Sequence, residues 1–294
     1  MIHCPSRTKR SHRSLARGQS SGGKIGSPSP YVPSAEESRA TSYPYLARMK
    51  SAMSSIEPGA SGFGGTPGYL NPVSMSAILT YLRDTCRMRS SGSIFCDIGC
   101  GEGRAVLAAL EACPRCGGAI GFEVDETTLM VARRNHERFL RRAWRGARYT
   151  HVQIEDSDRL PPACIVHADL THMTDLGCVS HAYSFCYGMP ADVVPHLFRV
   201  AAATESLRYL VLVYKKQRGD AAHELVEMLK NVSPSLHIFV DNKNRSQLRM
   251  PAQVVHGVCV RISPKVREIL KAASEGVSAV HPTTDLRKCF RRIT

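Results

Sequence analysis

The chain has 294 residues, of which 43% are hydrophobic, and it carries a formal net charge of +14. This length predicts one α/β domain with tails, and the hydrophobic fraction excludes a chain that is disordered throughout. The absence of a long apolar run excludes a membrane-spanning helix. The excess of basic residues favours a polyanionic partner, namely nucleic acid, a nucleoprotein or an anionic membrane surface, although a basic protein without such a partner has the same composition. Of these we expect nucleic acid or a nucleoprotein, and no membrane.

Residues 1–60 are rich in Ser, Gly, Pro and Arg and lack apolar periodicity, which predicts a disordered basic tail. The first 34 residues contain six Lys/Arg and no acid. Mitochondrial transit peptides share this composition with arms that contact phosphates, so both alternatives stay open.

Eleven cysteines without a preceding secretory signal predict a reducing compartment and free thiols. Cys113 and Cys116 form a CxxC pair, but no second pair has the spacing that a four-ligand zinc site requires. We therefore expect no metal site.

From residue 61 the pattern changes to alternating helices and strands. Helices are expected at 71–88, from Arg104, and at 125–145, 191–203, 221–230 and 264–273. Strands are expected at 93–98, 118–124, 164–168, 179–185, 207–214, 236–240 and 255–262. This alternation predicts an α/β, Rossmann-like domain over 61–275, with a mostly parallel sheet covered by helices on both faces and a basic tail at 276–294.

A glycine-rich turn, Asp97-Ile98-Gly99-Cys100-Gly101-Glu102-Gly103-Arg104, joins the first strand of this domain to the next helix. Glycines permit positive φ and a close approach of ligand to backbone, and the helix N-terminus faces what is bound. A dinucleotide fingerprint needs a glycine where Arg104 stands, and an acid just before the turn would repel pyrophosphate. The Asp97 carboxylate suits the ammonium group of an amino acid. We therefore expect S-adenosyl-L-methionine to bind at Asp97, Gly99, Gly101 and Gly103.

Two acids further along the chain support this cofactor. Glu123 closes the second strand, where its carboxylate can accept hydrogen bonds from both ribose hydroxyls. Asp169, beside Leu170, follows the third strand and can accept from the adenine amino group. One such acid is often only a solvated strand end. Three acids at successive strand ends on one sheet edge predict a cofactor site.

The arrangement resembles the class I S-adenosylmethionine-dependent methyltransferases over residues 62–262. The resemblance implies a seven-stranded sheet, mostly parallel, with one antiparallel strand near the end. It also implies that the residues after the fourth strand face the transferred methyl group.

Residues 184–190, Ser-Phe-Cys-Tyr-Gly-Met-Pro, look most like a segment of the non-SET histone-lysine methyltransferases, the disruptor-of-telomeric-silencing family. This resemblance implies a nuclear chromatin regulator that methylates a histone lysine on nucleosomes, with Ser184, Phe185 and Tyr187 as catalytic residues. The two aromatic rings would wall a channel in which the lysine pKa falls, and the Ser184 hydroxyl would orient the nitrogen. Ser184 stands where the family has asparagine, and the family's Tyr-Gly-Glu element is absent. We expect Cys186 to be a small buried residue.

Three histidines, His167, His172 and His181, lie near the expected site in the sequence. The sequence spacing indicates no carboxylate partner for any of them, so we expect each to be structural rather than catalytic.

The helix after Glu123 carries Arg134, Arg138, Arg141 and Arg145 on one face, at spacings of four, three and four. Such a stripe either contacts phosphates or is a solvated face. Two alternative functions therefore stay open. One is a methyltransferase for RNA or another protein, mitochondrial if the tail is a transit peptide. The other is a non-catalytic nucleic-acid-binding module on the same fold.

Overall fold

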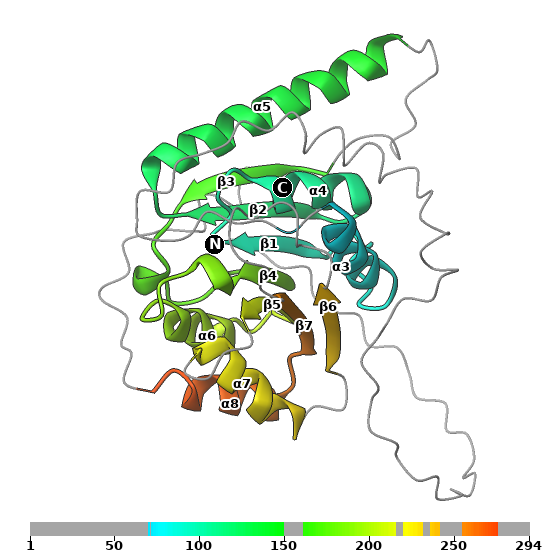
Figure 1. The fold of residues 1–294 in the computed structure, drawn as a ribbon. Helices are drawn as coiled ribbons and strands as arrows, with labels where there is room; N and C mark the ends of the chain where they lie inside the picture. The colour runs from blue at the N-terminus through cyan, green and yellow to red at the C-terminus, as the bar shows by residue number, and fades with distance from the viewer. Residues whose placement is uncertain are drawn as a thin grey trace, which may run out of the picture.

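The computed structural model describes residues 70, 72–149, 161–215, 220–231, 236–241 and 255–275, and the predicted tails, 1–60 and 276–294, lie outside these ranges. Seven strands form one sheet in the order β3-β2-β1-β4-β5-β7-β6 (Figure 1). The strands are β1 Ile94–Ile98, β2 Gly118–Glu123, β3 Ala163–His167, β4 His181–Phe185, β5 Tyr209–Lys215, β6 His237–Asp241 and β7 Val255–Arg261. Neighbouring pairs from β3 to β5 are parallel, whereas β7 runs antiparallel to both β5 and β6. The predicted α/β fold with a mostly parallel sheet is confirmed.

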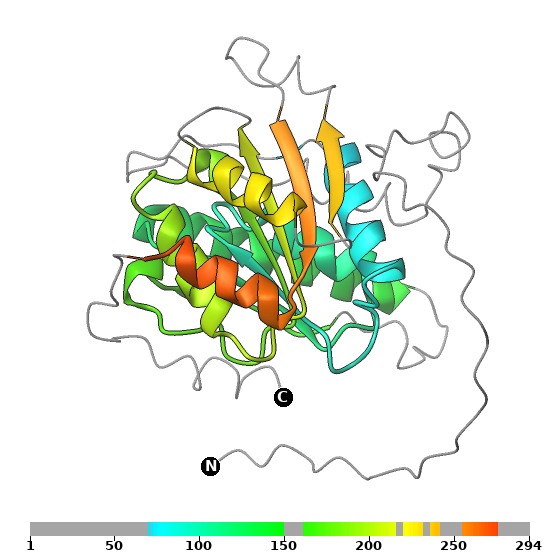
Figure 2. The same cartoon turned by 90° about the horizontal axis from the view of Figure 1, so that it is seen from below.

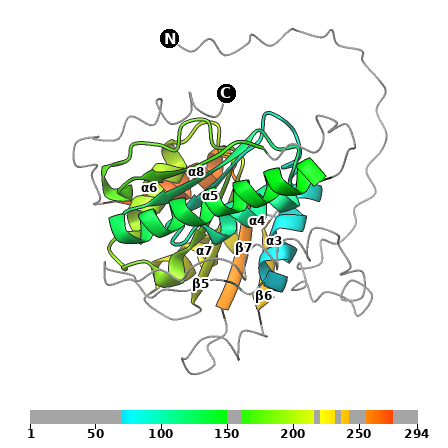
Figure 3. The ribbon, with the colours of Figure 1, turned by 90° about the horizontal axis from the view of Figure 1, so that it is seen from above.

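Helices cover both faces of this sheet, as the view from below shows (Figure 2). The helices are α3 Pro72–Asp84, α4 Arg104–Ala112, α5 Glu126–Tyr149, α6 Val194–Ala203, α7 Ala221–Lys230 and α8 Pro264–Ala272. Two short 3₁₀ helices, η2 Leu170–His172 and η3 Cys186–Gly188, follow β3 and β4 directly. The first three α-helices pack on one face, and α6, α7 and α8 pack on the other. Seen from above, α5 passes over α4 (Figure 3).

Each central strand contributes alternate side chains to two separate hydrophobic cores. In β1, Phe95 packs with α3 and α4, whereas Cys96 and Ile98 pack with the helices of the opposite face. All three side chains are at most 2% exposed. A strand that is buried on both faces reads as a continuous apolar run, which is why the central strands were predictable.

The observed α3 ends at Asp84, four residues before the predicted end at Met88. The chain turns through Arg87, which has φ 61, and the Met88 N–H then donates to the Leu82 carbonyl at 2.9 Å. Met88 is fully buried. Its apolar side chain extended the helical pattern in the sequence, but the backbone reaches the core through a turn.

The strand order places a topological switch point at the carboxyl ends of β1 and β4. After β1 the chain continues into α4 on one face of the sheet, whereas after β4 it continues through η3 into α6 on the other. Loops that leave in opposite directions separate at this point, and ligands of open α/β sheets bind in the resulting crevice.

Candidate functional site

The glycine turn lies at this crevice, between the end of β1 and the start of α4. Gly99, Gly101 and Gly103 have φ values of 74, 53 and 84, in the left-handed region that favours glycine. The N–H groups of Gly99 and Cys100 both donate to the Phe122 carbonyl, at 3.0 and 2.8 Å, which fixes the turn against β2. The three predicted glycines therefore shape one turn.

The space around this turn differs from glycine to glycine. A Cβ built on Gly99 would lie 2.9 Å from the Met189 side chain, and one on Gly103 would lie 3.7 Å from Ala132 and Ile165. A Cβ on Gly101 meets no atom of the described residues within 4 Å. Gly101 thus lies at the open part of the turn, where a ligand can approach the backbone.

Asp97 lies below the turn, one residue before the end of β1. It is 3% exposed, and no described residue donates a hydrogen bond to its carboxyl group. Burial, together with repulsion from Glu123, raises the pKa of Asp97 to about 8. A buried carboxyl group without a donor is suited to a cationic ligand, because a bound ammonium group would compensate its charge.

Glu123 ends β2 and joins the glycine turn to the next loop. Its Oε2 accepts from the Gly101 N–H at 2.8 Å, and its Oε1 accepts from the N–H groups of Val124 and Asp125 at 3.0 and 2.9 Å. The sequence did not predict these backbone contacts. An ionised carboxylate has about four lone-pair positions. Three N–H donors therefore leave it capable of one further bond, in keeping with a ribose hydroxyl.

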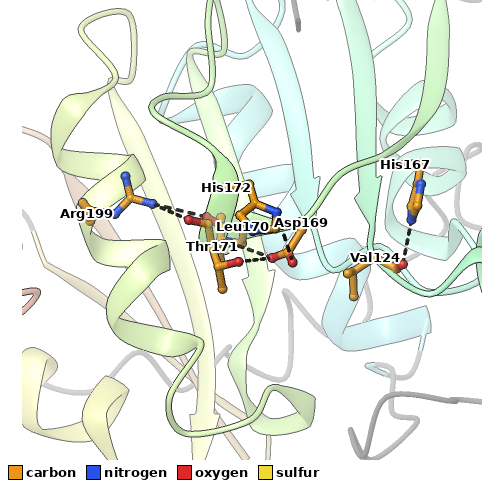
Figure 4. Close-up of polar contacts among 7 residues, drawn as sticks. All are labelled: Val124, His167, Asp169, Leu170, Thr171, His172 and Arg199. Carbon is orange, nitrogen blue, oxygen red and sulfur yellow. Dashed lines mark hydrogen bonds and ion pairs between the residues drawn. The ribbon is translucent and has the colours of Figure 1, made fainter. Parts of the chain in front are cut away.

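Asp169 and Leu170 follow β3 at the same edge of the sheet (Figure 4). Asp169 caps η2, since its Oδ1 accepts from both the N–H and the hydroxyl of Thr171, at 2.8 and 2.7 Å. The other carboxylate oxygen, Oδ2, lies 3.6 Å from His172 Nδ1. The structure therefore brings Asp97, Glu123 and Asp169 to the ends of three adjacent strands.

The three residues predicted to be catalytic lie at the end of β4 and in η3. Ser184 is fully buried, and its hydroxyl donates to the Ile98 carbonyl at 3.1 Å. This hydroxyl thus ties β4 to the end of β1, and its role in orienting an incoming nitrogen stays a prediction. The rings of Phe185 and Tyr187 are partly exposed, with centroids 5.8 Å apart at 53°. Cys186 is buried as expected, and burial raises its pKa to about 12, which disfavours a thiolate nucleophile.

Two of the three histidines make structural contacts, whereas His172 has the carboxylate neighbour that its spacing did not predict, with Nδ1 3.6 Å from Asp169 Oδ2. His167 bonds through Nε2 to the Val124 carbonyl at 2.8 Å and so ties β3 to the loop after Glu123 (Figure 4). His181 begins β4 and therefore lies at the amino end of the strand, away from the crevice. It is fully buried between Ser180 Oγ and the Cys86 carbonyl, at 2.8 and 3.1 Å.

Two further residues support the site and were not predicted. Asn135, on α5, is 3% exposed and donates to the Glu102 carbonyl inside the glycine turn at 3.2 Å. Arg199, on α6, donates to carbonyl groups of η2. Asn135 had a visible signal, because it shares the apolar face of its helix with Ala132 and Phe139. For Arg199 the sequence offers no comparable signal.

The arginine stripe is only partly described. Arg134, Arg138 and Arg141 are exposed on α5, whereas the side chain of Arg145 lies outside the described residues. Arg141 lies 3.5 Å from Glu137, and both side chains are largely exposed, so this ion pair contributes little to stability. Among the described helices, none combines the length and apolar character that crossing a membrane requires.

The fold and the strand-end site define the architecture of this chain as the Rossmann-like class I methyltransferase fold. Among solved structures, a candidate RNA methyltransferase from Pyrococcus horikoshii superposes with a TM-score of 0.50 at 13% identity, covering 75% of this chain and 100% of its own. No family model matches the chain, and no curated protein matches it in sequence.

Two lower-scoring structures have methyltransferase in their descriptions as well. A human methyltransferase 10 domain containing protein has a TM-score of 0.46 at 10% identity, over 76% of this chain and 96% of its own. Magnesium protoporphyrin IX methyltransferase from Synechocystis, solved with bound S-adenosylmethionine, has a TM-score of 0.42 at 13% identity. The match covers 76% of this chain and 92% of its own. Both TM-scores lie below 0.5, and the fold is defined by the strand order and by the likeness to the Pyrococcus horikoshii structure.

Proposed function

We propose that this chain is an S-adenosylmethionine-dependent methyltransferase. The observation that carries the proposal is the Asp97 carboxyl group, which is buried beneath a positive-φ glycine turn without a hydrogen-bond donor from the described residues. A structural role gives no reason to bury an acid in this way, whereas a ligand ammonium group does.

The residues at the carboxyl ends of β1, β2 and β3 fit the separate parts of this cofactor. Asp97 would pair with the ammonium group, Glu123 would accept from the ribose, and Asp169 with the Leu170 N–H would face the adenine. The open side of Gly101 leaves room for the ligand to contact the protein backbone. The three acids belong to adjacent strands, so one extended ligand can reach them all.

When bound, the cofactor supplies a methyl group on a positively charged sulfur. The chain must then hold an acceptor in line with that methyl group and keep water out, and proximity with desolvation accounts for much of the rate. Phe185 and Tyr187, at the end of β4 beside the crevice, are the described side chains best suited to wall the acceptor site. The buried Ser184 contributes by fixing β4 to β1.

RNA is the acceptor that we propose, in preference to a histone lysine. The net charge of +14 and the exposed arginines of α5 favour a polyanion. The solved structure with a TM-score of 0.50 is described as a candidate RNA methyltransferase. The histone interpretation depended on residues 184–190, of which Ser184 is fully buried with its hydroxyl bonded to the Ile98 carbonyl.

The substrate is tested by incubating the full chain with tritiated S-adenosylmethionine and, separately, total RNA, reconstituted nucleosomes and free histones. We expect the wild type to label RNA, and the D97N variant, as the negative control, to leave RNA unlabelled. Label on histones with none on RNA would contradict the RNA proposal and restore the histone-lysine interpretation. No label on any acceptor, together with no cofactor binding, would contradict the enzyme proposal itself.

A further inference from the structure

An arginine on α6 holds the turn that carries Asp169. Arg199 Nη2 donates to the carbonyl oxygens of Leu170 and Thr171, each at 3.4 Å (Figure 4). Its Nε is buried without a hydrogen-bond partner among the described residues. All hydrogen bonds that this guanidinium donates to described residues therefore have carbonyl groups of η2 as acceptors.

The same turn is held from its other side by Asp169. The Thr171 N–H donates to Asp169 Oδ1 at 2.8 Å, while the carbonyl of the same peptide group, that of Leu170, accepts from Arg199. In a planar trans peptide the N–H and C=O point in opposite directions. The Leu170–Thr171 peptide group thus lies between a guanidinium and a carboxylate, and each hydrogen bond polarises the other.

This arrangement fixes how Asp169 presents its carboxylate. Oδ1 is engaged by the Thr171 N–H and hydroxyl, and Oδ2 has only the longer approach of His172 Nδ1, at 3.6 Å. The Leu170 N–H has no acceptor among the described residues. Two consecutive residues after β3 therefore offer one carboxylate oxygen without a short hydrogen bond and one N–H donor.

We propose that Arg199 is a positioning residue for base recognition, which orients Asp169 and the Leu170 N–H so that they select adenine in the cofactor. The inference depends on the proposed function. Adenine offers an amino donor beside a ring-nitrogen acceptor, which complements this pair. Hypoxanthine, the base of inosine, offers a carbonyl and a ring N–H instead, and mismatches the pair at both positions. A well-formed two-bond contact discriminates between bases by about 1–3 kcal/mol, or roughly 10- to 100-fold.

The test measures dissociation constants of S-adenosylhomocysteine and S-inosylhomocysteine by titration calorimetry on the full chain. The wild type should prefer the adenosyl ligand by about 10- to 100-fold. R199M should weaken adenosyl binding about tenfold with little change for the inosyl ligand, because only the adenine contacts lose their orientation. R199K, which can still reach one carbonyl, should retain an intermediate preference.

A double variant separates positioning from general destabilisation. The preference lost in D169N/R199M should be smaller than the sum of the losses in D169N and R199M, since Arg199 acts in part through Asp169. R133M is the matched control, because Arg133 also donates to a backbone carbonyl, that of Ile165 at 3.4 Å, within β3 and four residues before Asp169. It should keep the wild-type preference.

Two outcomes would overturn the inference. R199M with the wild-type preference would show that Arg199 does not orient the base contacts, and an equal loss of both ligands would show a purely structural clamp. If R199M does not fold, the same measurement is made on R199Q, which keeps an amide donor. The ratio of its dissociation constants for the inosyl and adenosyl ligands then tests the inference. Failure of the wild type to bind either ligand would instead contradict the proposed function.

Discussion

At the scale of single residues, Asp97 links the stability of the chain to its proposed ligand. Its pKa is raised to about 8, against about 3.9 for an unfolded aspartate. Between these values the folded state binds a proton that the unfolded state has lost. The free energy of unfolding therefore falls as the pH rises from about 4 to 8, in the absence of ligand.

The D97N variant should remove this pH dependence. Since asparagine carries no charge to desolvate, we expect the variant to be more stable than the wild type at pH 8, by about 2–4 kcal/mol, and similar at pH 4. Urea denaturation across this range measures the effect. Identical pH profiles for the two proteins would show that Asp97 titrates normally, and so would remove the basis of the ammonium site.

Gly101 provides a second test at this scale. Its open side and its φ of 53 predict that G101R abolishes binding of S-adenosylhomocysteine, because the new side chain would occupy the ligand's approach. Gly92 is the matched control, since a Cβ there also meets no atom within 4 Å but the residue lies in the turn before β1. G92R should bind like the wild type. Retained affinity in G101R would contradict the position of the ligand.

Single residues also show where sequence reasoning reaches its limit. Asp97, Glu123 and Asp169 were predictable, because the carboxyl ends of adjacent parallel strands meet at one edge. The orientation of Ser184 was not, since its partner, the Ile98 carbonyl, lies on another strand 86 residues away. Arg199 contacts η2 from a helix 28 and 29 residues away, and spacing along the chain does not indicate such a contact.

At the scale of elements, most strands and helices were predictable from apolar runs and amphipathic patterns. The differences lie at their ends. The helix predicted at 71–88 stops at Asp84, and the strand predicted at 179–185 starts only at His181. In both places a buried side chain extends the apolar pattern beyond the residues that make the helical or strand hydrogen bonds. The 3₁₀ helices that carry Leu170 and Tyr187 are too short to have a periodic signal.

His181 connects two of these elements and should make stability depend on pH. Burial lowers its pKa to about 4, whereas an unfolded histidine has about 6.5. Its Nε2 must donate to the Cys86 carbonyl, which leaves Nδ1 to accept from Ser180. The unfolded state therefore binds more protons between pH 6.5 and 4, and acidification through this window destabilises the fold.

The H181Q variant should lack this contribution. The wild type should lose up to about 3 kcal/mol between pH 6.5 and 4 relative to the variant. Denaturant unfolding of both proteins measures the difference, and the opposite contribution of Asp97 cancels because both proteins contain it. Parallel stability profiles would mean that His181 has the same pKa in the folded and unfolded states, and would contradict the lowered pKa.

At the scale of the whole molecule, the basic charge and the exposed face of α5 are the features that favour RNA. The double reversal R138E/R141E should weaken RNA binding and lower the slope of log affinity against log salt by about 1–2, because fewer counterions are released. The charge-matched control is R261E/K265E, at exposed positions near the start of α8. Filter binding at several salt concentrations measures both. Equal losses in the two variants would indicate net charge alone, not a surface on α5.

Calorimetric titration of S-adenosylhomocysteine into the full wild-type chain at pH 7 tests the cofactor site itself. We predict one site, with an apparent enthalpy that differs between phosphate and Tris buffers, because Asp97 must release its proton to pair with the ligand's ammonium group. The absence of binding would contradict the site. Binding without proton release would contradict the assignment of Asp97.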